Sequence, residues 1–180
     1  MTGPSTRELH LVELVAPDGT PIGQATVIDA HTAPGSLHRA FSVVLFDPAG
    51  RTLLQQRAAG KTRFPLRWAN ACCGHPEPGQ PVAEAASRRL EQELGVRCLA
   101  FEEVGVYSYR ALDPATGRVE HEYDHVLVTR VPDGLEVAPD PTEVAAVRWT
   151  PINDIKEGAT DHAPWLSGVL QLAIAATATD

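Results

Sequence analysis

The spacing of apolar residues predicts one amphipathic helix most clearly, over Pro81–Leu94. Its apolar residues recur at three- and four-residue steps and form one stripe: Val82, Ala85, Ala86, Leu90 and Leu94. Pro81 suits the first turn of a helix, where its missing N–H has no partner to lose, and Gly95 suits the end. Further helices are predicted over Pro151–Glu157 and Pro164–Thr177.

Short β-branched and aromatic runs between turn residues predict strands elsewhere. The turn Asp47–Gly50 joins the runs Ala40–Phe46 and Thr52–Arg57 into a predicted hairpin, and Lys61–Trp68 follows as a basic, aromatic loop. The other predicted strands are Leu9–Val15, Gln24–Ile28, Cys98–Tyr109, Glu120–Val131 and Ala145–Thr150. Together these elements predict one α+β domain over residues 1–180, an α/β/α sandwich with a mixed sheet, with a flexible end at residues 1–8.

Composition narrows the possible functions. The 180 residues include 15 basic and 23 acidic side chains, for a net charge of −8, and 43% are hydrophobic. The acidic balance argues against non-specific nucleic-acid binding, and no apolar run is long enough to predict a membrane span. Of the 3 cysteines, Cys72 and Cys73 are adjacent and do not pair easily, so a reducing cytoplasm is the expected location.

Candidate chemistry lies in three places. His31 and His38 occupy one polar segment, Cys73-Gly74-His75 precedes the main helix, and Glu120-His121-Glu122 falls in a predicted strand. Alternation along a strand places Glu120 and Glu122 on the same face. Three imidazoles and two carboxylates would suit a Mn²⁺, Zn²⁺ or Mg²⁺ site, although each feature alone is also typical of ordinary surface or core residues.

A more specific pattern surrounds the main helix. Six residues fall where the Nudix box would place them: Gly74, Arg88, Leu90, Glu93, Gly95 and Val96. Gln80, Arg89 and Gln92 stand where Nudix pyrophosphohydrolases carry Glu, which those enzymes use to bind Mg²⁺. The chain thus resembles a Nudix fold whose hydrolytic site has been rebuilt; a degenerate, inactive Nudix domain is the alternative.

Within that superfamily the chain resembles the type 1 isopentenyl-diphosphate isomerases, from about Leu11 to Trp165. The matching strings are His31-Thr32-Ala33, Leu37-His38, Ala40-Phe41-Ser42, Leu53-Leu54, Arg57, Lys61, Trp68 through Pro76, Arg88-Arg89, Glu93-Leu94-Gly95, Tyr109-Arg110-Ala111, Glu120-His121-Glu122 and Pro164-Trp165. The resemblance implies conversion of isopentenyl diphosphate to dimethylallyl diphosphate by protonation and deprotonation through a tertiary carbocation.

The resemblance also implies a role for each matching residue. The implied catalytic residues are Cys73, Glu122, Tyr109 and Trp165. The implied metal ligands are His31, His38, His75, Glu120 and Glu122, which would hold Mn²⁺, Zn²⁺ or Mg²⁺, and Glu93, which would hold a substrate-linked Mg²⁺. The implied diphosphate-binding cations are Arg57, Lys61 and Arg89. A small-molecule prenyl diphosphate is then the expected partner, with no nucleic acid or membrane, and the chain is expected to be a monomer or weak homodimer.

One departure leaves the substrate open. The family commonly has a lysine at the position of Val27, where it contributes to diphosphate binding. An isomerase-like enzyme for another prenyl diphosphate is therefore an alternative. A Nudix diphosphate hydrolase and a non-catalytic binding module are two others, which the depleted box and the presence of both Cys73 and Glu122, respectively, argue against.

Overall fold

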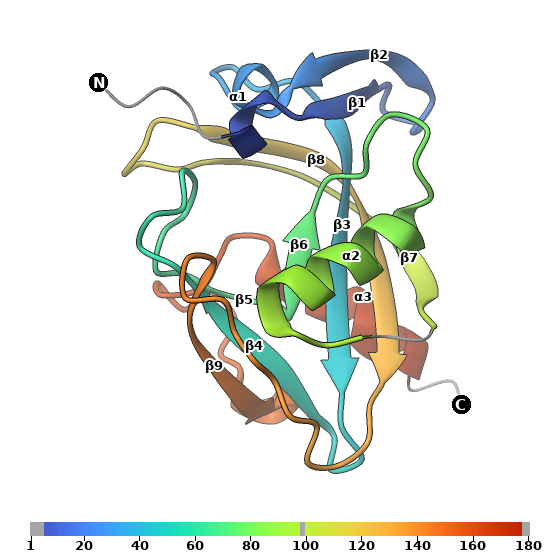
Figure 1. Cartoon of the computed structure of the whole chain (residues 1–180), viewed down its shortest axis with the longest axis vertical. Coiled ribbons are helices and arrows are strands. Elements are labelled where there is room, and N and C mark those ends of the chain that lie inside the picture. Colours follow the sequence, from blue (N-terminus) through green and yellow to red (C-terminus); the bar gives the residue numbers. More distant parts are fainter. Residues whose placement is uncertain (1–5, 98–99, 178–180) are drawn as a thin grey trace.

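The computed structural model describes residues 6–97 and 100–177 (Figure 1). The strands are β1 Leu11–Val15, β2 Pro21–Thr26, β3 His38–Phe46, β4 Arg51–Arg57, β5 Trp68–Ala69, β6 Cys72–Gly74, β7 Glu102–Leu112, β8 Val119–Arg130 and β9 Val144–Pro151. The helices are α1 Val27–Ala30, α2 Val82–Leu94 and α3 Leu166–Thr177, with short 3-10 helices at Thr6–Leu9 and Ile152–Asp154.

Strand β3 is the centre of a mixed sheet. It pairs antiparallel with β1, β4 and β6 and parallel with β8, while β7 continues the sheet beyond β8 and β9 pairs with β4. Phe41, Val43 and Leu45 pack on the α2 side of the sheet, whereas Val44 and Phe46 pack on the α3 side. A strand that buries both faces reads as a continuous apolar run, as β3 does. The predicted sandwich with a mixed sheet is confirmed, with α2 and α3 on opposite faces (Figure 1).

The main helix forms where its apolar stripe predicts. Helix α2 begins after Pro81, buries Ala85, Leu90 and Leu94, and ends at Gly95. Gly95 adopts a left-handed conformation with φ of 67°, and its N–H donates to the carbonyl of Glu91. Glycine adopts this conformation without the steric cost that a Cβ imposes, so it closes the helix well.

The predicted strand Gln24–Ile28 is wrong in its second half. Strand β2 ends at Thr26, and Val27 begins the short helix α1. The Thr26 hydroxyl accepts a hydrogen bond from the N–H of Asp29 at 3.2 Å and so caps this turn. The β-branched side chains of Val27 and Ile28 favoured a strand, but this local cap favours a helical turn instead.

Other boundaries differ by less. The helix predicted over Pro151–Glu157 is only the 3-10 turn Ile152–Asp154, because Pro151 still belongs to β9 and Ile155 is already extended. The short strands β5 and β6 lie in a segment for which no strand was predicted. The predicted start of a strand at Cys98 lies outside the described residues, and β7 begins at Glu102. Within the end predicted to be flexible, residues 1–5 also lie outside them, and Thr6–Leu9 forms a 3-10 helix.

Within the described part of the chain, no helix combines the length and the apolar character needed to cross a membrane.

Candidate active site

Strand β8 places a row of acidic side chains on one buried face of the sheet. Glu120, Glu122 and Asp124 alternate along the strand, and their exposed fractions are 4%, 7% and 0%. The parallel register sets Glu122 opposite His38 on β3, and the antiparallel register sets it opposite Tyr109 on β7. Burying carboxyl groups is costly unless partners satisfy them, so this row marks a candidate site.

Five of the predicted ligands come together at one end of this row. One ligand atom each from His31, His38, His75, Glu120 and Glu122 lies within 4.8 Å of the others. His31 caps the end of α1, His38 begins β3 and His75 follows β6, so the group unites distant parts of the chain. The three imidazole ring centroids are separated by 4.6, 5.0 and 4.8 Å.

The orientation of the buried histidines fits metal coordination. Nδ1 of His31 lies 2.7 Å from the Val27 carbonyl, and Nδ1 of His38 lies 2.8 Å from the Ser36 carbonyl. A carbonyl oxygen accepts only, so Nδ1 carries a proton in both rings, which leaves Nε2 as the nitrogen that could bind a metal ion. Both Nε2 atoms and Glu120 Oε2 are buried without a hydrogen-bond partner among the described residues, although His31 Nε2 lies 2.9 Å from Glu120 Oε2. Orphaned acceptors that converge in this way suit a cation.

The protonation of the imidazoles points the same way. Burial, with the nearby His31, lowers the pKa of His38 to about 3. Burial and the other two imidazoles lower the pKa of His75 well below its usual value. Metal binding needs neutral imidazoles, and these two rings are neutral at physiological pH.

Arg63 fixes Glu120 from outside the cluster. Its Nε donates to Glu120 Oε1 at 3.1 Å, and its Nη1 donates to Glu8 Oε1 at 3.0 Å. Burial alone would raise the pKa of Glu120, but His31 and Arg63 together hold that pKa well below its usual value. Neither Arg63 nor Glu8 was predicted as a site residue, because their contacts join segments that no local pattern connects.

Glu122 is the carboxyl group of this row that contacts both Tyr109 and His75. Burial, with the negative charges of Glu120 and Asp124, raises the pKa of Glu122 well above its usual value. Tyr109 donates to Glu122 Oε2 at 2.7 Å, and His75 Nε2 lies 2.9 Å from Oε1. Burial and the charge of Glu122 also raise the pKa of Tyr109, so the phenol stays protonated. A buried carboxyl group with a raised pKa is typical of a general acid.

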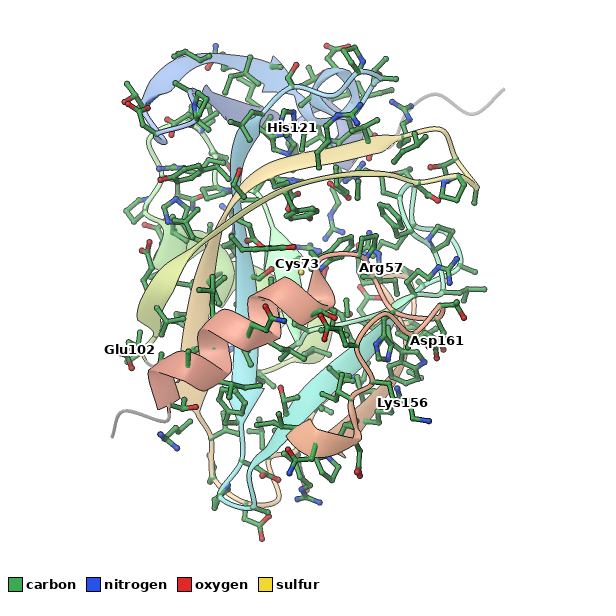
Figure 2. All side chains as sticks on the ribbon, turned by 180° about the vertical axis from the view of Figure 1, so that it is seen from behind. Arg57, Cys73, Glu102, His121, Lys156 and Asp161 are labelled. Carbon is green, nitrogen blue, oxygen red and sulfur yellow. The ribbon has the colours of Figure 1, made fainter. Side chains whose placement is uncertain are left out.

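Cys73 lies on the same face of the sheet, beside the amino-terminal end of α3 and near Arg57 (Figure 2). Its thiol lies 3.5 Å from the Ser42 hydroxyl and donates to Asn70 Oδ1 at 3.3 Å. Burial, with the charge of Asp124, raises the pKa of Cys73 to about 12, so the thiol is neutral at physiological pH. The next residue is Gly74, and a larger residue would not fit there, because its Cβ would lie 2.8 Å from the Phe41 ring.

Aromatic side chains form the wall next to the thiol. The indole of Trp165 donates to Asn70 Oδ1 at 3.2 Å, and its ring centroid lies 5.8 Å from that of Tyr109. The Arg57 guanidinium lies 5.5 Å from the Trp165 centroid. Cys73, Glu122, Tyr109 and Trp165 all line one cavity of about 660 Å³.

The cavity also carries the predicted diphosphate-binding cations. Arg57, Lys61 and Arg89 all line it. Lys61 and Arg89 both form ion pairs with Glu93 and with Glu143, the latter a residue that was not predicted. Glu93, the residue predicted to hold the substrate-linked Mg²⁺, is not part of the His/Glu cluster.

Arg57 also holds the loop that carries Lys61. Its Nε and Nη2 donate to the Arg63 carbonyl, and Nε also donates to the Phe64 carbonyl. Phe64 has a φ of 44° and Leu66 a φ of 60°, conformations that non-glycine residues adopt at a cost. The loop is therefore held in a strained shape at the edge of the cavity.

Val27, which stands where the family commonly has a lysine, is a buried packing residue in this chain. The Val27 side chain packs with Val12 and Ala30, and only 6% of it is exposed. Its carbonyl is the acceptor that orients His31. The side chain also lines the cavity, but it brings no charge to it.

The fold and site define the class of the protein as Nudix, and a protein-family model for the NUDIX domain matches residues 36–171. The chain is 55% identical to an isopentenyl-diphosphate Delta-isomerase of Nocardia farcinica, covering 92% of this chain and 95% of that one. It is 46% identical to the enzyme of the same name from Streptomyces coelicolor, covering 93% and 85%. The chain therefore belongs to the isopentenyl-diphosphate Delta-isomerase family of Nudix proteins.

Solved structures agree on the fold. The crystal structure of DR0079 from Deinococcus radiodurans superposes with a TM-score of 0.68, covering 91% of this chain and 99% of that one. Its sequence identity is only 17%, so this likeness concerns the fold alone.

Proposed function

We propose that this chain interconverts isopentenyl diphosphate and dimethylallyl diphosphate. The observation that carries the proposal is one cavity lined by two groups that can exchange protons and come from different strands, Cys73 of β6 and Glu122 of β8. Moving an unactivated double bond requires a proton to be added at one carbon and another to be removed nearby. Two such groups meet that requirement when one is protonated and supplies the first proton, and the other is deprotonated and accepts the second.

The residues around these two groups favour a carbocation over its capture by a nucleophile. Protonation of the terminal methylene carbon of the substrate creates a tertiary carbocation, and loss of a proton from the neighbouring methylene group completes the reaction. The faces of Trp165 and Tyr109 stabilise positive charge through their quadrupoles, by about 0.5–2 kcal/mol. The neutral thiol of Cys73 is a weaker nucleophile than a thiolate, and its raised pKa keeps it protonated.

The His/Glu cluster fits a divalent ion, and we propose Mn²⁺, Zn²⁺ or Mg²⁺ there. His31, His38, His75, Glu120 and Glu122 would be its ligands. When bound, the ion would act as a Lewis acid that lowers the proton affinity of the Glu122 carboxylate. Glu122 itself is held by Tyr109 and His75, and these contacts point its carboxyl group in one direction.

Removal of one imidazole should release the ion. In His75→Ala we expect the affinity for Mn²⁺ or Zn²⁺ to fall by at least about tenfold, since even indirect partners of a metal contribute that much. The matched control is His121→Ala, because His121 lies on β8 between Glu120 and Glu122 but contacts the Gly35 carbonyl and is outside the cluster. Metal content after dialysis gives the measurement. Equal metal content in the two variants would contradict the proposed site.

The diphosphate would bind at the cationic side of the cavity. Lys61 and Arg89 are paired with Glu93 and Glu143, so a diphosphate with its Mg²⁺ could take over their positive charges while the Mg²⁺ binds Glu93. Arg57, at the end of β4, would contribute a third positive charge to the diphosphate site. Because the diphosphate is remote from the double bond, its binding would position the reacting carbons.

Loss of one of these cations should mainly weaken binding. In Arg89→Met we expect KM for isopentenyl diphosphate to rise by about 10- to 100-fold, which corresponds to one charge-assisted hydrogen bond, with a smaller change in kcat. Arg97→Met is the matched control, because Arg97 pairs with Glu91 at an exposed position. Steady-state kinetics of both variants give the values. An unchanged KM in Arg89→Met would remove this residue from the diphosphate site.

Product analysis tests the function itself. The purified protein with Mg²⁺ and isopentenyl diphosphate should form dimethylallyl diphosphate without releasing phosphate or pyrophosphate. Hydrolysis without isomer would favour a Nudix hydrolase, and tight binding without turnover would favour a binding module. Turnover of a different prenyl diphosphate only would assign the chain another substrate, with Val27 as the first residue to examine.

A further inference from the structure

The thiol of Cys73 has a polar partner that the proposed reaction does not yet use. Antiparallel pairing of β3 and β6 sets Ser42 directly opposite Cys73, and the Ser42 hydroxyl lies 3.5 Å from the sulfur. Side chains at directly opposite positions of paired strands point to the same face of the sheet. A shift of one residue would replace Ser42 with Phe41 or Val43, so the strand register determines this contact.

Ser42 is itself locked in place by a buried carboxyl group. Its hydroxyl donates to Asp124 Oδ2 at 2.7 Å, so the serine oxygen presents its lone pairs to the thiol. Ser42 is 1% exposed and Asp124 is 0% exposed. The other Asp124 oxygen has no hydrogen-bond partner among the described residues.

Among the described residues, Asp124 has one oxygen bonded to Ser42 and the other without a hydrogen-bond partner. A buried carboxyl group with one unpaired oxygen is costly, and an apolar side chain would cost less at this position. Buried polar atoms without partners are rare in native proteins, so the function of the site is a reason to keep one here. Here the carboxyl group fixes the hydroxyl that touches the reactive sulfur.

Asn70 supplies the second contact of the thiol. Its amide nitrogen donates to the carbonyls of Val43 and Cys72, which turns Oδ1 toward Cys73 and Trp165. The single thiol proton is thus shared between two acceptor oxygens, Ser42 Oγ at 3.5 Å and Asn70 Oδ1 at 3.3 Å, which are each fixed by further hydrogen bonds. A cysteine side chain rotates about one torsion with three favoured positions, and two fixed partners select one of them.

We propose that Ser42, fixed by Asp124, is a positioning residue that orients the Cys73 thiol toward the substrate double bond. The inference rests on the proposed isomerase function and adds two residues to it. Orientation matters because a proton-transfer group acts only when its heavy atom faces the reacting carbon. Ser42 and Asp124 act through Cys73, and neither of them lines the cavity.

Kinetics of four variants and one control variant test the proposal. Ser42→Ala and Asp124→Val are each expected to lower kcat about tenfold, the worth of one hydrogen bond, while KM stays within about twofold of wild type. The double variant should be no slower than the slower single variant, because both changes break the same contact. Asp124→Asn keeps an oxygen acceptor for Ser42 and should recover most of the kcat. Thr52→Val is the matched control, because Thr52 is a buried hydroxyl on β4 outside the cavity lining and should leave kcat unchanged.

Several outcomes would overturn the proposal. These are an unchanged kcat in Ser42→Ala, a rise in KM alone, additive losses in the double variant, or an Asp124→Asn variant as slow as Asp124→Val. If Asp124→Val does not fold, Ser42→Ala decides, since it removes a single atom. A crystal structure of Ser42→Ala gives a readout that does not depend on turnover: Cys73 should occupy more than one rotamer, and one unchanged rotamer would contradict the role. If the wild-type protein fails to isomerise, the proposed function fails while this structural test remains decisive.

Discussion

Replacing Cys73 with alanine is expected to lower kcat for isopentenyl diphosphate on the order of 10³-fold while the protein stays folded. A positioned acid or base contributes about 10²- to 10⁴-fold, and a methyl group cannot exchange a proton with the substrate. The change removes one atom from a half-buried position, so the free energy of unfolding should fall by only about 1 kcal/mol. Steady-state kinetics and thermal unfolding of the same preparation measure both effects.

The neighbouring cysteine provides the control. Cys72 is fully buried in the core on the α2 side and does not line the cavity. We expect Cys72→Ala to lose a comparable amount of stability and to keep kcat within about threefold of wild type. If Cys72→Ala were inactive and Cys73→Ala active, the thiol would have been assigned to the wrong residue.

Glu122→Gln is expected to cause a loss of similar size, also on the order of 10³-fold in kcat. Glutamine keeps the shape of the side chain and can still contact Tyr109 and His75, but it cannot deliver or accept the transferred proton. Because Glu122 also belongs to the metal cluster, metal content must be measured alongside the rate. A variant that keeps its metal and loses its rate separates proton transfer from metal binding.

An exposed glutamate is the matched control for this change. Glu91 lies on α2 and pairs with Arg97 at the surface. Glu91→Gln should leave kcat and metal content unchanged. Near-normal turnover in Glu122→Gln would remove Glu122 from the proton path.

The sequence predicted the parts of this site that follow local rules. Alternation along one strand predicted that Glu120 and Glu122 share a face, and the structure places both on the buried face of β8. The same alternation extends to Asp124, so the signal for this residue was present but was not used. The helix stripe predicted α2, which carries Arg89 and Glu93.

Long-range contacts explain what was not predicted. Arg63 joins Glu8 to Glu120, and Glu143 joins Lys61 to Arg89, across segments far apart in the chain. No spacing rule relates such residues, because strand pairing and loop packing determine which of them meet. The two-residue strand β5 is likewise too short to leave a periodic pattern. The assigned roles of the clustered residues stay predictions until the variants above are measured.

Turnover in D₂O tests the central claim most directly. Wild-type protein with Mg²⁺ and isopentenyl diphosphate should yield dimethylallyl diphosphate that carries deuterium in its newly formed methyl group, observed by nuclear magnetic resonance. The proton added to the double bond would then have come from a group that exchanges with solvent, as Cys73 and Glu122 both can. Isomer formed without deuterium would contradict proton transfer by these groups, and release of phosphate or pyrophosphate without isomer would contradict the proposed isomerase.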